Sequence, residues 1–355
     1  MLVKIAVARV AAVAGESVFA GRNRQEPEDM TTRIVILDGL TLSSNDNPWD
    51  QIEQLGKVTR YDETAPGEVI ERLQGAAVAV VNKVPLSAEV LEQLPQLKLI
   101  AVTATGYDCV HLPTARAQGI TVCNVPTYGT DSVAQFAFAL LLELCHQVGR
   151  HDGAVRAGDW QRAGTFSFWQ TPQIELAGLT LGVIGFGRIG RRVAEIGRAF
   201  GMKILACDEY HGNPPDWPSF RWASADEIAA GSDVVTLHCN LTETSRKMVD
   251  AGFLLKMKPT AFLITAARGG LVDEPALAEA LNAGRLAGAG LDVVSAEPIR
   301  DDNPLLKARN CLLTPHMAWS TLAARRRIMA TTCDNIREFL AGCPGNVVRT
   351  GQKIN

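Results

Sequence analysis

From residue 33 onward, short apolar and β-branched runs alternate with segments whose apolar positions recur at helical spacing. The short runs show no alternation of apolar and polar positions, which is typical of strands covered on both faces. Such strand–helix alternation predicts parallel sheets joined by crossover helices. The predicted strands are Ile34–Asp38, Val78–Asn82, Leu99–Thr103, Ile120–Val125, Leu181–Gly185, Ile204–Asp208, Val234–His238, Phe262–Ala266, Gly288–Val293 and Leu312–Thr314.

This pattern fits two sheets, and we expect an α/β fold of two doubly wound, Rossmann-like parallel-sheet domains. The sheets should meet near residues 131–144, where a helix carries apolar side chains on every side. A helix without a polar face must be buried, either between domains or subunits or in an ordinary core. In the first sheet, Asn47 and Pro48 suit the N-cap and first position of a short helix that ends at Gly56.

Composition and charge narrow the class of protein. With 355 residues, 47% of them hydrophobic and 21% charged, the chain is expected to be globular and to form two domains. The formal net charge is −3 and the longest basic run is Arg325–Arg327, so nucleic acid is not an expected partner. The sequence contains no run of 18 apolar residues, so no membrane span is predicted.

Cysteine usage and the N-terminus bear on localisation. The eight cysteines form no CxxC pair and no cysteine–histidine cluster, so we expect no metal site and a reducing compartment, the cytoplasm. Residues 1–30 are interpreted as an extension outside the fold, because Met30 directly precedes the first strand. A secretory signal is the alternative, but Arg9 and Glu16 interrupt its apolar run.

A glycine-rich loop predicts a dinucleotide site. Gly185, Gly187 and Gly190 follow the strand Leu181–Gly185 and open an amphipathic helix, so the phosphates of a dinucleotide can bind at the helix N-terminus. Asp208 ends the next strand, where a carboxylate binds ribose hydroxyls and repels a 2′-phosphate. We therefore expect NAD rather than NADP. Arg188 within the loop either contacts the pyrophosphate or lies solvated.

Three polar residues follow later strands of the same sheet, where open α/β sheets bind ligands. They are Arg268, Glu297 and His316. Histidine suits proton donation to a carbonyl that receives a hydride, and a neighbouring carboxylate stabilises and orients its ring. Arginine can hold a substrate carboxylate. Each residue alone has an ordinary structural explanation, but together they indicate a dehydrogenase acting on a keto acid.

These residues carry a resemblance to the D-isomer-specific 2-hydroxyacid dehydrogenases over residues 31–350. Within that family the chain is most similar to bacterial glycerate dehydrogenases, also called hydroxypyruvate reductases. The segments that carry the resemblance are residues 82–86, 104–108, 124–135, 185–190, 267–269, 292, 297–298 and 314–319.

The resemblance implies a cleft between an NAD-binding domain, residues 128–316, and a discontinuous substrate-binding domain, residues 31–127 plus 317–355. It implies His316 as acid/base, Glu297 as its partner and Arg268 as substrate anchor, in a homodimer. Further candidates for substrate contact are Gly106, Lys83 and Trp319. The alternative interpretations, that Lys83 is a solvated loop residue and Trp319 a core residue, are equally compatible with the sequence. The remaining expected cofactor contacts are Thr105, Ile189, Asn240, Ala266, Asp292 and Ala318.

The best candidate reaction is interconversion of D-glycerate and hydroxypyruvate, with glyoxylate as another substrate. Another 2-hydroxyacid dehydrogenase, such as the phosphoglycerate type, is an alternative. A second alternative is a non-enzymatic NAD-sensing protein of the same fold, because fold alone does not fix function. Formate dehydrogenases of this family lack the carboxylate partner of the histidine, so Glu297 argues against that activity.

Overall fold

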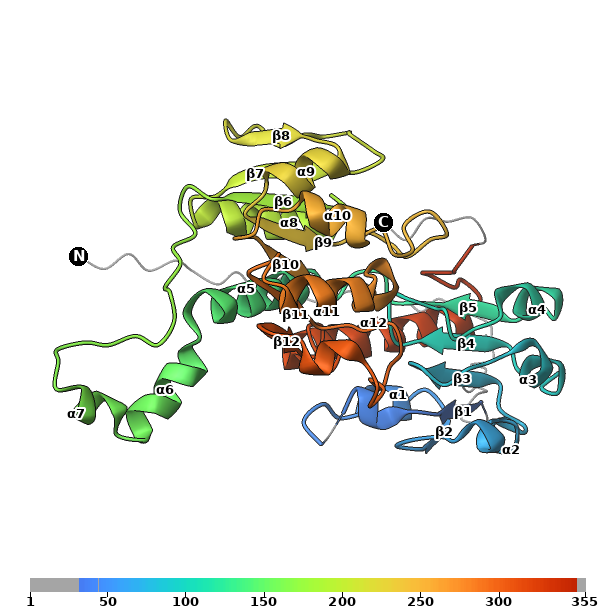
Figure 1. Cartoon of the computed structure of the whole chain (residues 1–355). Helices are drawn as coiled ribbons and strands as arrows, with labels where there is room; N and C mark the ends of the chain where they lie inside the picture. Colours follow the sequence, from blue (N-terminus) through green and yellow to red (C-terminus); the bar gives the residue numbers. More distant parts are fainter. Residues whose placement is uncertain (1–31, 44, 350–355) are drawn as a thin grey trace, which may run out of the picture.

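The computed structural model describes residues 32–43 and 45–349. The predicted N-terminal extension, residues 1–30, and the last residues of the predicted substrate-binding domain, 350–355, lie outside the described residues. The described chain forms two fully parallel sheets of five and seven strands (Figure 1). The predicted two-domain Rossmann-like α/β fold is thereby confirmed.

The first sheet has the strand order β2-β1-β3-β4-β5. Successive residues of its central strands enter two different apolar cores, with Ile34 in one and Val35 in the other, which explains the continuous apolar runs. Its strands are β1 (Arg33–Ile36), β2 (Lys57–Arg60), β3 (Val78–Val81), β4 (Leu99–Val102) and β5 (Thr121–Cys123). The helices that connect them are α1 (Asp50–Glu53), α2 (Val69–Leu73), α3 (Ala88–Glu92) and α4 (Leu112–Ala117), with the 3-10 helices η1 (Gly39–Thr41) and η2 (Pro66–Glu68).

The second sheet has the strand order β12-β11-β10-β9-β6-β7-β8. Its strands are all parallel, but the order in which the chain adds them reverses between β6 and β9, as in Rossmann folds. Its strands are β6 (Thr180–Ile184), β7 (Lys203–Cys207), β8 (Phe220–Trp222), β9 (Val234–Leu237), β10 (Phe262–Thr265), β11 (Gly288–Leu291) and β12 (Cys311–Leu313). Its helices are α8 (Arg188–Ala199), α9 (Ala225–Gly231), α10 (Ala251–Lys256) and α11 (Glu274–Asn282), with the 3-10 helices η3 (Gly269–Leu271) and η4 (Pro304–Lys307).

Two long helices connect the halves of the chain. The predicted apolar helix is α5 (Thr130–His146), which packs against α8, β10 and β11 of the second sheet. Helix α12 (Leu322–Leu340) returns to the first sheet, where Ile328, Met329 and Ile336 join the core beside β1, β3 and β4. The core on one face of the first sheet is therefore completed by a helix that lies some 200 residues further along the chain, after the strands of the second sheet.

One local expectation is wrong. Helix α1 begins at Asp50 with Trp49 at its N-cap, so Asn47 and Pro48 do not start it. Asn47 is instead buried, and its side-chain amide donates to the Leu42 carbonyl at 3.2 Å. The amide thus closes the turn before the helix.

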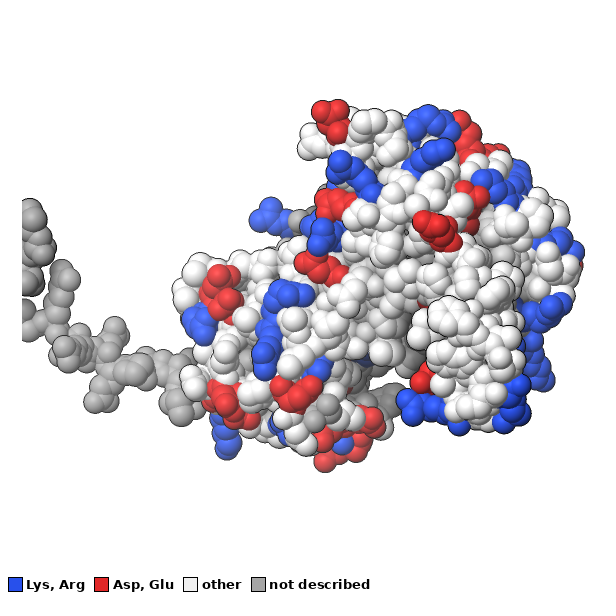
Figure 2. All heavy atoms as spheres, turned by 90° about the vertical axis from the view of Figure 1, so that its left-hand side faces the viewer, with Lys and Arg blue, Asp and Glu red and all other residues white. Residues whose placement is uncertain are grey.

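Helices α6 (Val148–Arg156) and α7 (Asp159–Ala163) project away from both sheets as an arm (Figure 1). Basic and acidic side chains are interspersed on the face that carries this arm, with broad uncharged areas between them (Figure 2). Among the described residues no single helix is long and apolar enough to cross a membrane. Helices α5 and α6 together reach that length only across a 51° bend.

Candidate active site

The three candidate catalytic residues follow the carboxyl ends of adjacent strands. Arg268 follows β10, Glu297 lies in the loop after β11, and His316 lies just after β12. His316 Nδ1 is 2.7 Å from Glu297 Oε2. Because a carboxylate only accepts hydrogen bonds, this contact places a proton on Nδ1 and directs Nε2 away from Glu297. The structure thus brings the predicted histidine and carboxylate into direct contact.

The backbone around His316 is held in an unusual conformation. His316 has a φ of +51°, a region that non-glycine residues rarely adopt. The buried carboxylate of Asp292 fixes it by accepting hydrogen bonds from Thr314 Oγ1 (2.6 Å), Met317 N (2.9 Å) and Ala318 N (2.8 Å). The His316 N–H also donates to the Asp292 carbonyl at 2.8 Å. Asp292 therefore fixes the backbone from which the histidine ring projects.

The environment of Glu297 favours its ionised form. Burial alone would raise the pKa of this carboxyl, but the hydrogen bond and charge of His316, the Val294 N–H and the charge on Lys83 together lower it. A second carboxylate anchors the same loop, since buried Glu274 accepts from Ser295 N (2.6 Å), Ser295 Oγ (2.9 Å) and Asn303 Nδ2 (2.9 Å). The loop is therefore fixed on both sides of Glu297.

Arg268 meets a loop of the first sheet. A Cβ at Gly106 would lie only 2.8 Å from Arg268 Nη2, so the absence of a side chain at Gly106 gives the guanidinium its place. Thr105 beside it donates from Oγ1 to the Val125 carbonyl at 2.8 Å. Gly106 and Arg268, which are distant in the sequence and follow strands of different sheets, are thus brought together.

The other two candidate substrate residues differ in their surroundings. Lys83 is exposed in the loop after β3, and its positive charge contributes to the lowered pKa of Glu297. Trp319 is half-buried against the core of the first sheet, and its ring meets that of Tyr128 edge-on with centroids 6.3 Å apart. The side chain of Trp319 therefore has a packing role, whatever else it contacts.

Sequence reasoning missed Tyr128, which lies in the segment that crosses from the first sheet to the second. Burial raises the pKa of its phenol to about 12, against the opposing effects of the nearby Arg268 charge and a hydrogen bond from the Thr105 backbone. This half-buried phenol, near the Arg268 charge and the Thr105 loop, is a further polar group at this site. The one signal in the sequence was its place in the segment 124–135 that carries the family resemblance.

The glycine loop fits a dinucleotide pyrophosphate. Gly185 has a φ of +91°, and a Cβ there would clash with the Cys239 backbone, while a Cβ at Gly190 would clash with the Gly185 carbonyl. A Cβ at Gly187 would meet no described atom within 4 Å, so the approach to the N-terminus of α8 is open. Two glycines thus permit the turn and the close packing, and the third leaves room for phosphate.

Asp208 and Arg188 flank this loop. The Asp208 carboxylate accepts from Phe186 N at 2.6 Å and Tyr210 N at 3.0 Å, which ties the end of β7 to the glycine loop. Arg188 donates from Nη2 to the Pro126 carbonyl at 2.8 Å, on the crossing segment. The nearby guanidinium of Arg191 is engaged by the Gly212 and Asn213 carbonyls, 2.8 and 2.7 Å away. With both arginines engaged by carbonyl groups, the Asp208 carboxylate is the main charged group at the expected position of the ribose.

The other predicted cofactor residues surround the same edge of the sheet. Ile189 lies in the first turn of α8, Asn240 follows β9, Ala266 follows β10, and buried Ala318 follows the histidine. Within residues 32–43 and 45–349, no group of three or more His, Cys, Asp or Glu side chains is placed to hold a metal ion.

Comparison with known proteins decides the family. Residues 138–318 match the model of the D-isomer specific 2-hydroxyacid dehydrogenase NAD binding domain. The chain belongs to the D-isomer specific 2-hydroxyacid dehydrogenase family. It is therefore an oxidoreductase of the 2-hydroxy acid/2-keto acid class with NAD(H) as cofactor, and the glycine loop described above lies inside the matched domain.

Similar proteins cover almost the whole chain. A hydroxypyruvate reductase of Blautia hydrogenotrophica is 44% identical over 319 residues, 89% of this chain and 99% of the relative. A glycerate dehydrogenase of Methylorubrum extorquens is 41% identical, over 90% of this chain and 99% of the relative. Among solved structures, a D-lactate dehydrogenase from Aquifex aeolicus complexed with NAD and lactic acid superposes with a TM-score of 0.76 at 29% identity, covering 91% of this chain and 100% of the other.

Proposed function

We propose that this dehydrogenase interconverts hydroxypyruvate and D-glycerate with NAD(H), and that glyoxylate is a second substrate. The observation that carries the chemistry is the 2.7 Å contact between His316 and Glu297, with Arg268 after the neighbouring strand. The names of the two similar proteins support the choice of substrate.

The residues have complementary roles in the proposed reduction. The Arg268 guanidinium binds the substrate carboxylate and orients the carbonyl. NADH, when bound, supplies the hydride to the carbonyl carbon. His316 donates the Nε2 proton to the carbonyl oxygen, and the negative charge of Glu297 stabilises the protonated ring before that transfer. In the reverse direction the neutral ring takes the proton from the substrate hydroxyl.

We propose that Lys83, Gly106 and Trp319 line the substrate side, with Lys83 facing the polar end of hydroxypyruvate. The proposed domain division places residues 31–127 and 317–355 on this side and residues 128–316 around the cofactor. Its support is the return of α12 to the first sheet and the packing of α5 on the second. Thr105, Gly185, Gly187, Arg188, Ile189, Gly190, Asp208, Asn240, Ala266, Asp292 and Ala318 are the proposed cofactor contacts.

The test is NADH oxidation followed at 340 nm with hydroxypyruvate, glyoxylate, pyruvate and 3-phosphohydroxypyruvate. We expect hydroxypyruvate to be reduced fastest, and we expect His316→Ala to abolish turnover while NADH still binds. His111→Ala, on an exposed histidine before α4, is the matched control and should turn over normally. No turnover of any acid, with intact NADH binding, would favour the NAD-sensing alternative. Fastest turnover of the phosphorylated acid would favour the phosphoglycerate type.

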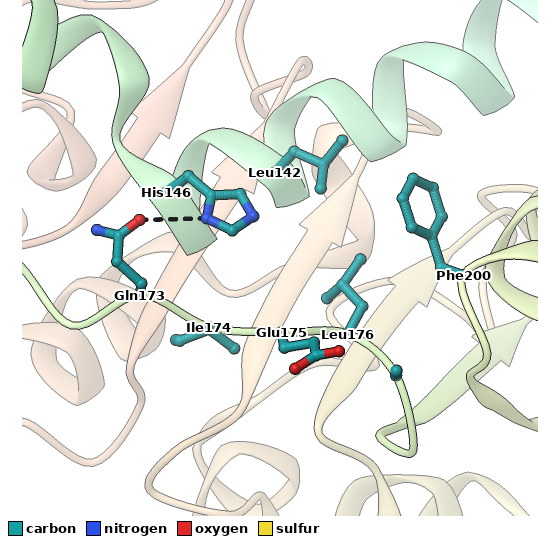
Figure 3. Close-up of a pocket in the computed structure, with 8 residues that line it drawn as sticks. Leu142, His146, Gln173, Ile174, Glu175, Leu176 and Phe200 are labelled. Atoms are coloured by element: carbon teal, nitrogen blue, oxygen red, sulfur yellow. Dashed lines mark hydrogen bonds between the residues drawn. The ribbon is translucent and has the colours of Figure 1, made fainter.

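We also propose that the enzyme is a homodimer that uses the arm formed by α6 and α7. The arm and the loop after it expose aromatic side chains, with Phe166 95% and Trp169 68% accessible. At the base of the arm lies an apolar pocket of about 470 Å³. Leu142 and Phe200 lie on one side of it and residues 173–177 along the other (Figure 3). Exposed aromatic groups and an open apolar pocket are typical of an interface.

Analytical ultracentrifugation tests the dimer. Phe166→Ser combined with Trp169→Ser should yield monomers, whereas Leu255→Ser, at an equally exposed apolar position on α10, should leave the sedimentation coefficient unchanged. A monomeric wild-type enzyme would disprove this proposal without affecting the proposed reaction.

We further propose a cytoplasmic location. All eight cysteines of the sequence lie in the described residues, and none of them is paired. Free thiols of this number fit a reducing compartment. Fractionation of cells that express the full chain, with immunodetection, tests this, and recovery outside the cytoplasm would refute it.

A further inference from the structure

A buried carboxylate lies behind the substrate side of the site. Asp38 lies two residues after the end of β1, is only 8% exposed, and is not among the site residues expected from the sequence. In the first sheet the order in which the chain adds strands reverses between β1 and β3. Asp38 and the loop after β3 therefore flank the topological switch point of this sheet. Ligands of open α/β sheets bind outside the carboxyl ends of the strands at such points.

Asp38 binds the backbone of the loop that carries Lys83. Oδ1 accepts from Asn82 N at 2.8 Å. Oδ2 accepts from Asn82 N at 3.0 Å, Lys83 N at 2.6 Å and Val84 N at 3.2 Å. Three successive N–H groups converging on one anionic group form a nest, an arrangement that fixes the backbone of the donating segment. The position of the Lys83 Cα is therefore set by Asp38.

The same loop is bound to the segment that carries Gly106. Asn82 Nδ2 donates to the Thr103 carbonyl at 3.2 Å, and Leu86 N donates to the Cys109 carbonyl at 2.7 Å. Residues 82–86 and 103–110 consequently form one hydrogen-bonded rim on the substrate side. Asp38 supports this rim from beneath.

Lys83 and Gly106 stand on this one rim, and a Cβ at Gly106 would lie 2.8 Å from Arg268 Nη2, so the rim borders the proposed substrate anchor. The positive charge of Lys83 also contributes to the lowered pKa of Glu297. Because Lys83 is exposed and its side chain is flexible, the direction of its approach depends on the backbone that holds it. That backbone is held by Asp38.

We infer that Asp38 is a positioning residue that acts through Lys83: it fixes the loop from which this ammonium group is presented to the substrate, on the rim beside Arg268. The inference rests on the proposed reduction of a 2-keto acid. Asp38 contacts neither substrate nor cofactor, so its removal should weaken substrate binding and leave the chemical step and NADH binding intact.

A double-mutant cycle tests this mechanism. Asp38→Asn keeps the shape but replaces one acceptor oxygen with an NH2 group that faces backbone donors. We expect the KM for hydroxypyruvate to rise about tenfold, by loss of charge-assisted hydrogen bonds, with kcat within about twofold. We expect Lys83→Met to raise KM similarly, and Asp38→Asn to add nothing further in the Lys83→Met background.

Asp233→Asn is the matched control, because Asp233 also accepts a backbone N–H, that of Thr180 at 2.9 Å, but supports the cofactor sheet. It should leave KM unchanged. Additive effects of the two substitutions on KM, or an effect of Asp38→Asn on NADH affinity alone, would overturn the inference. If Asp38→Asn does not fold, Asn82→Ala takes its place in the cycle, because it releases the same loop at the Thr103 anchor.

Hydrogen–deuterium exchange gives a readout that does not depend on turnover. The peptide that contains residues 82–86 should exchange faster in Asp38→Asn than in the wild type, while peptides of the glycine loop should not change. Unchanged exchange of residues 82–86 would refute the positioning role. Failure of the wild type to reduce hydroxypyruvate would instead refute the proposed function and leave this measurement intact.

Discussion

Replacing Glu297 with glutamine removes a negative charge beside His316 but keeps an oxygen that can accept the Nδ1–H hydrogen bond. The negative charge of Glu297 stabilises the protonated ring, so its removal should weaken proton donation by His316. Reduction of the keto acid needs that proton donation. Glu297→Gln should therefore lower kcat/KM in the reduction direction.

The size of this loss follows from the geometry. Two unit charges about 4 Å apart interact by about 4 kcal/mol at an effective dielectric constant of about 20 and by about 1 kcal/mol in water. The side chains of His316 and Glu297 are 26% and 38% exposed, so solvent screens much of the interaction. An effective value of roughly 1–2 kcal/mol corresponds to a loss of about 5- to 30-fold in kcat/KM.

The assay is kcat/KM for hydroxypyruvate with saturating NADH at pH 7, and for D-glycerate with saturating NAD at the same pH. In oxidation the ring receives the proton, and it does so less readily without the Glu297 charge, so kcat/KM for D-glycerate should fall as well. Glu279→Gln is the control, because that exposed carboxylate pairs only with Arg285 at the surface among the described residues. Wild-type kcat/KM in both directions would refute the electrostatic role of Glu297.

Three further substitutions test separate parts of the site. Gly106→Ala places a methyl group 2.8 Å from Arg268 Nη2 and should reduce kcat/KM for the keto acid by roughly 10- to 100-fold in steady-state assays, with NADH affinity unchanged. Asp208→Asn removes the charge that repels a 2′-phosphate and should reduce the preference for NADH over NADPH by about tenfold when both are compared as ratios of kcat/KM. Tyr128→Phe removes the phenol that the Thr105 backbone binds and should raise KM for the keto acid about fivefold in the same assay. For each substitution, a wild-type value of the named quantity would contradict the prediction.

The central strands and the glycine loop could be predicted because local sequence specifies them. Buried parallel strands such as β3 and β10 need apolar residues at every position, and the loop at residues 185–190 needs glycines where a Cβ would clash. The edge strands β2 and β8 were missed because each pairs on one side only and carries polar residues, such as Thr59 and Arg221. Their formation depends on the neighbouring strand rather than on their own pattern.

The polar contacts behind the site could not be predicted for a different reason. Tyr128 comes near Arg268 only after the two sheets have been brought together, and Asp38 reaches the Lys83 backbone only after β1 and β3 have paired. A tyrosine in a crossing segment and an aspartate after a strand have many possible partners in the sequence alone. The histidine–glutamate pair was recognisable because its chemistry restricts the residue types.

Carboxylates at the ends of elements hold most of the loops at this site. Active-site loops have no strand ladder of their own, so their backbone N–H groups need other acceptors. Short acidic side chains supply these acceptors and also fix the direction of the loop, which keeps the functional groups preorganised without a core beneath them. An acidic residue after a strand was interpreted from the sequence as a ligand contact, yet the same carboxylate also binds its own loop. This arrangement recurs at Asp38 for Lys83, at Asp208 for the glycine loop, at Asp292 for His316 and at Glu274 for the loop of Glu297.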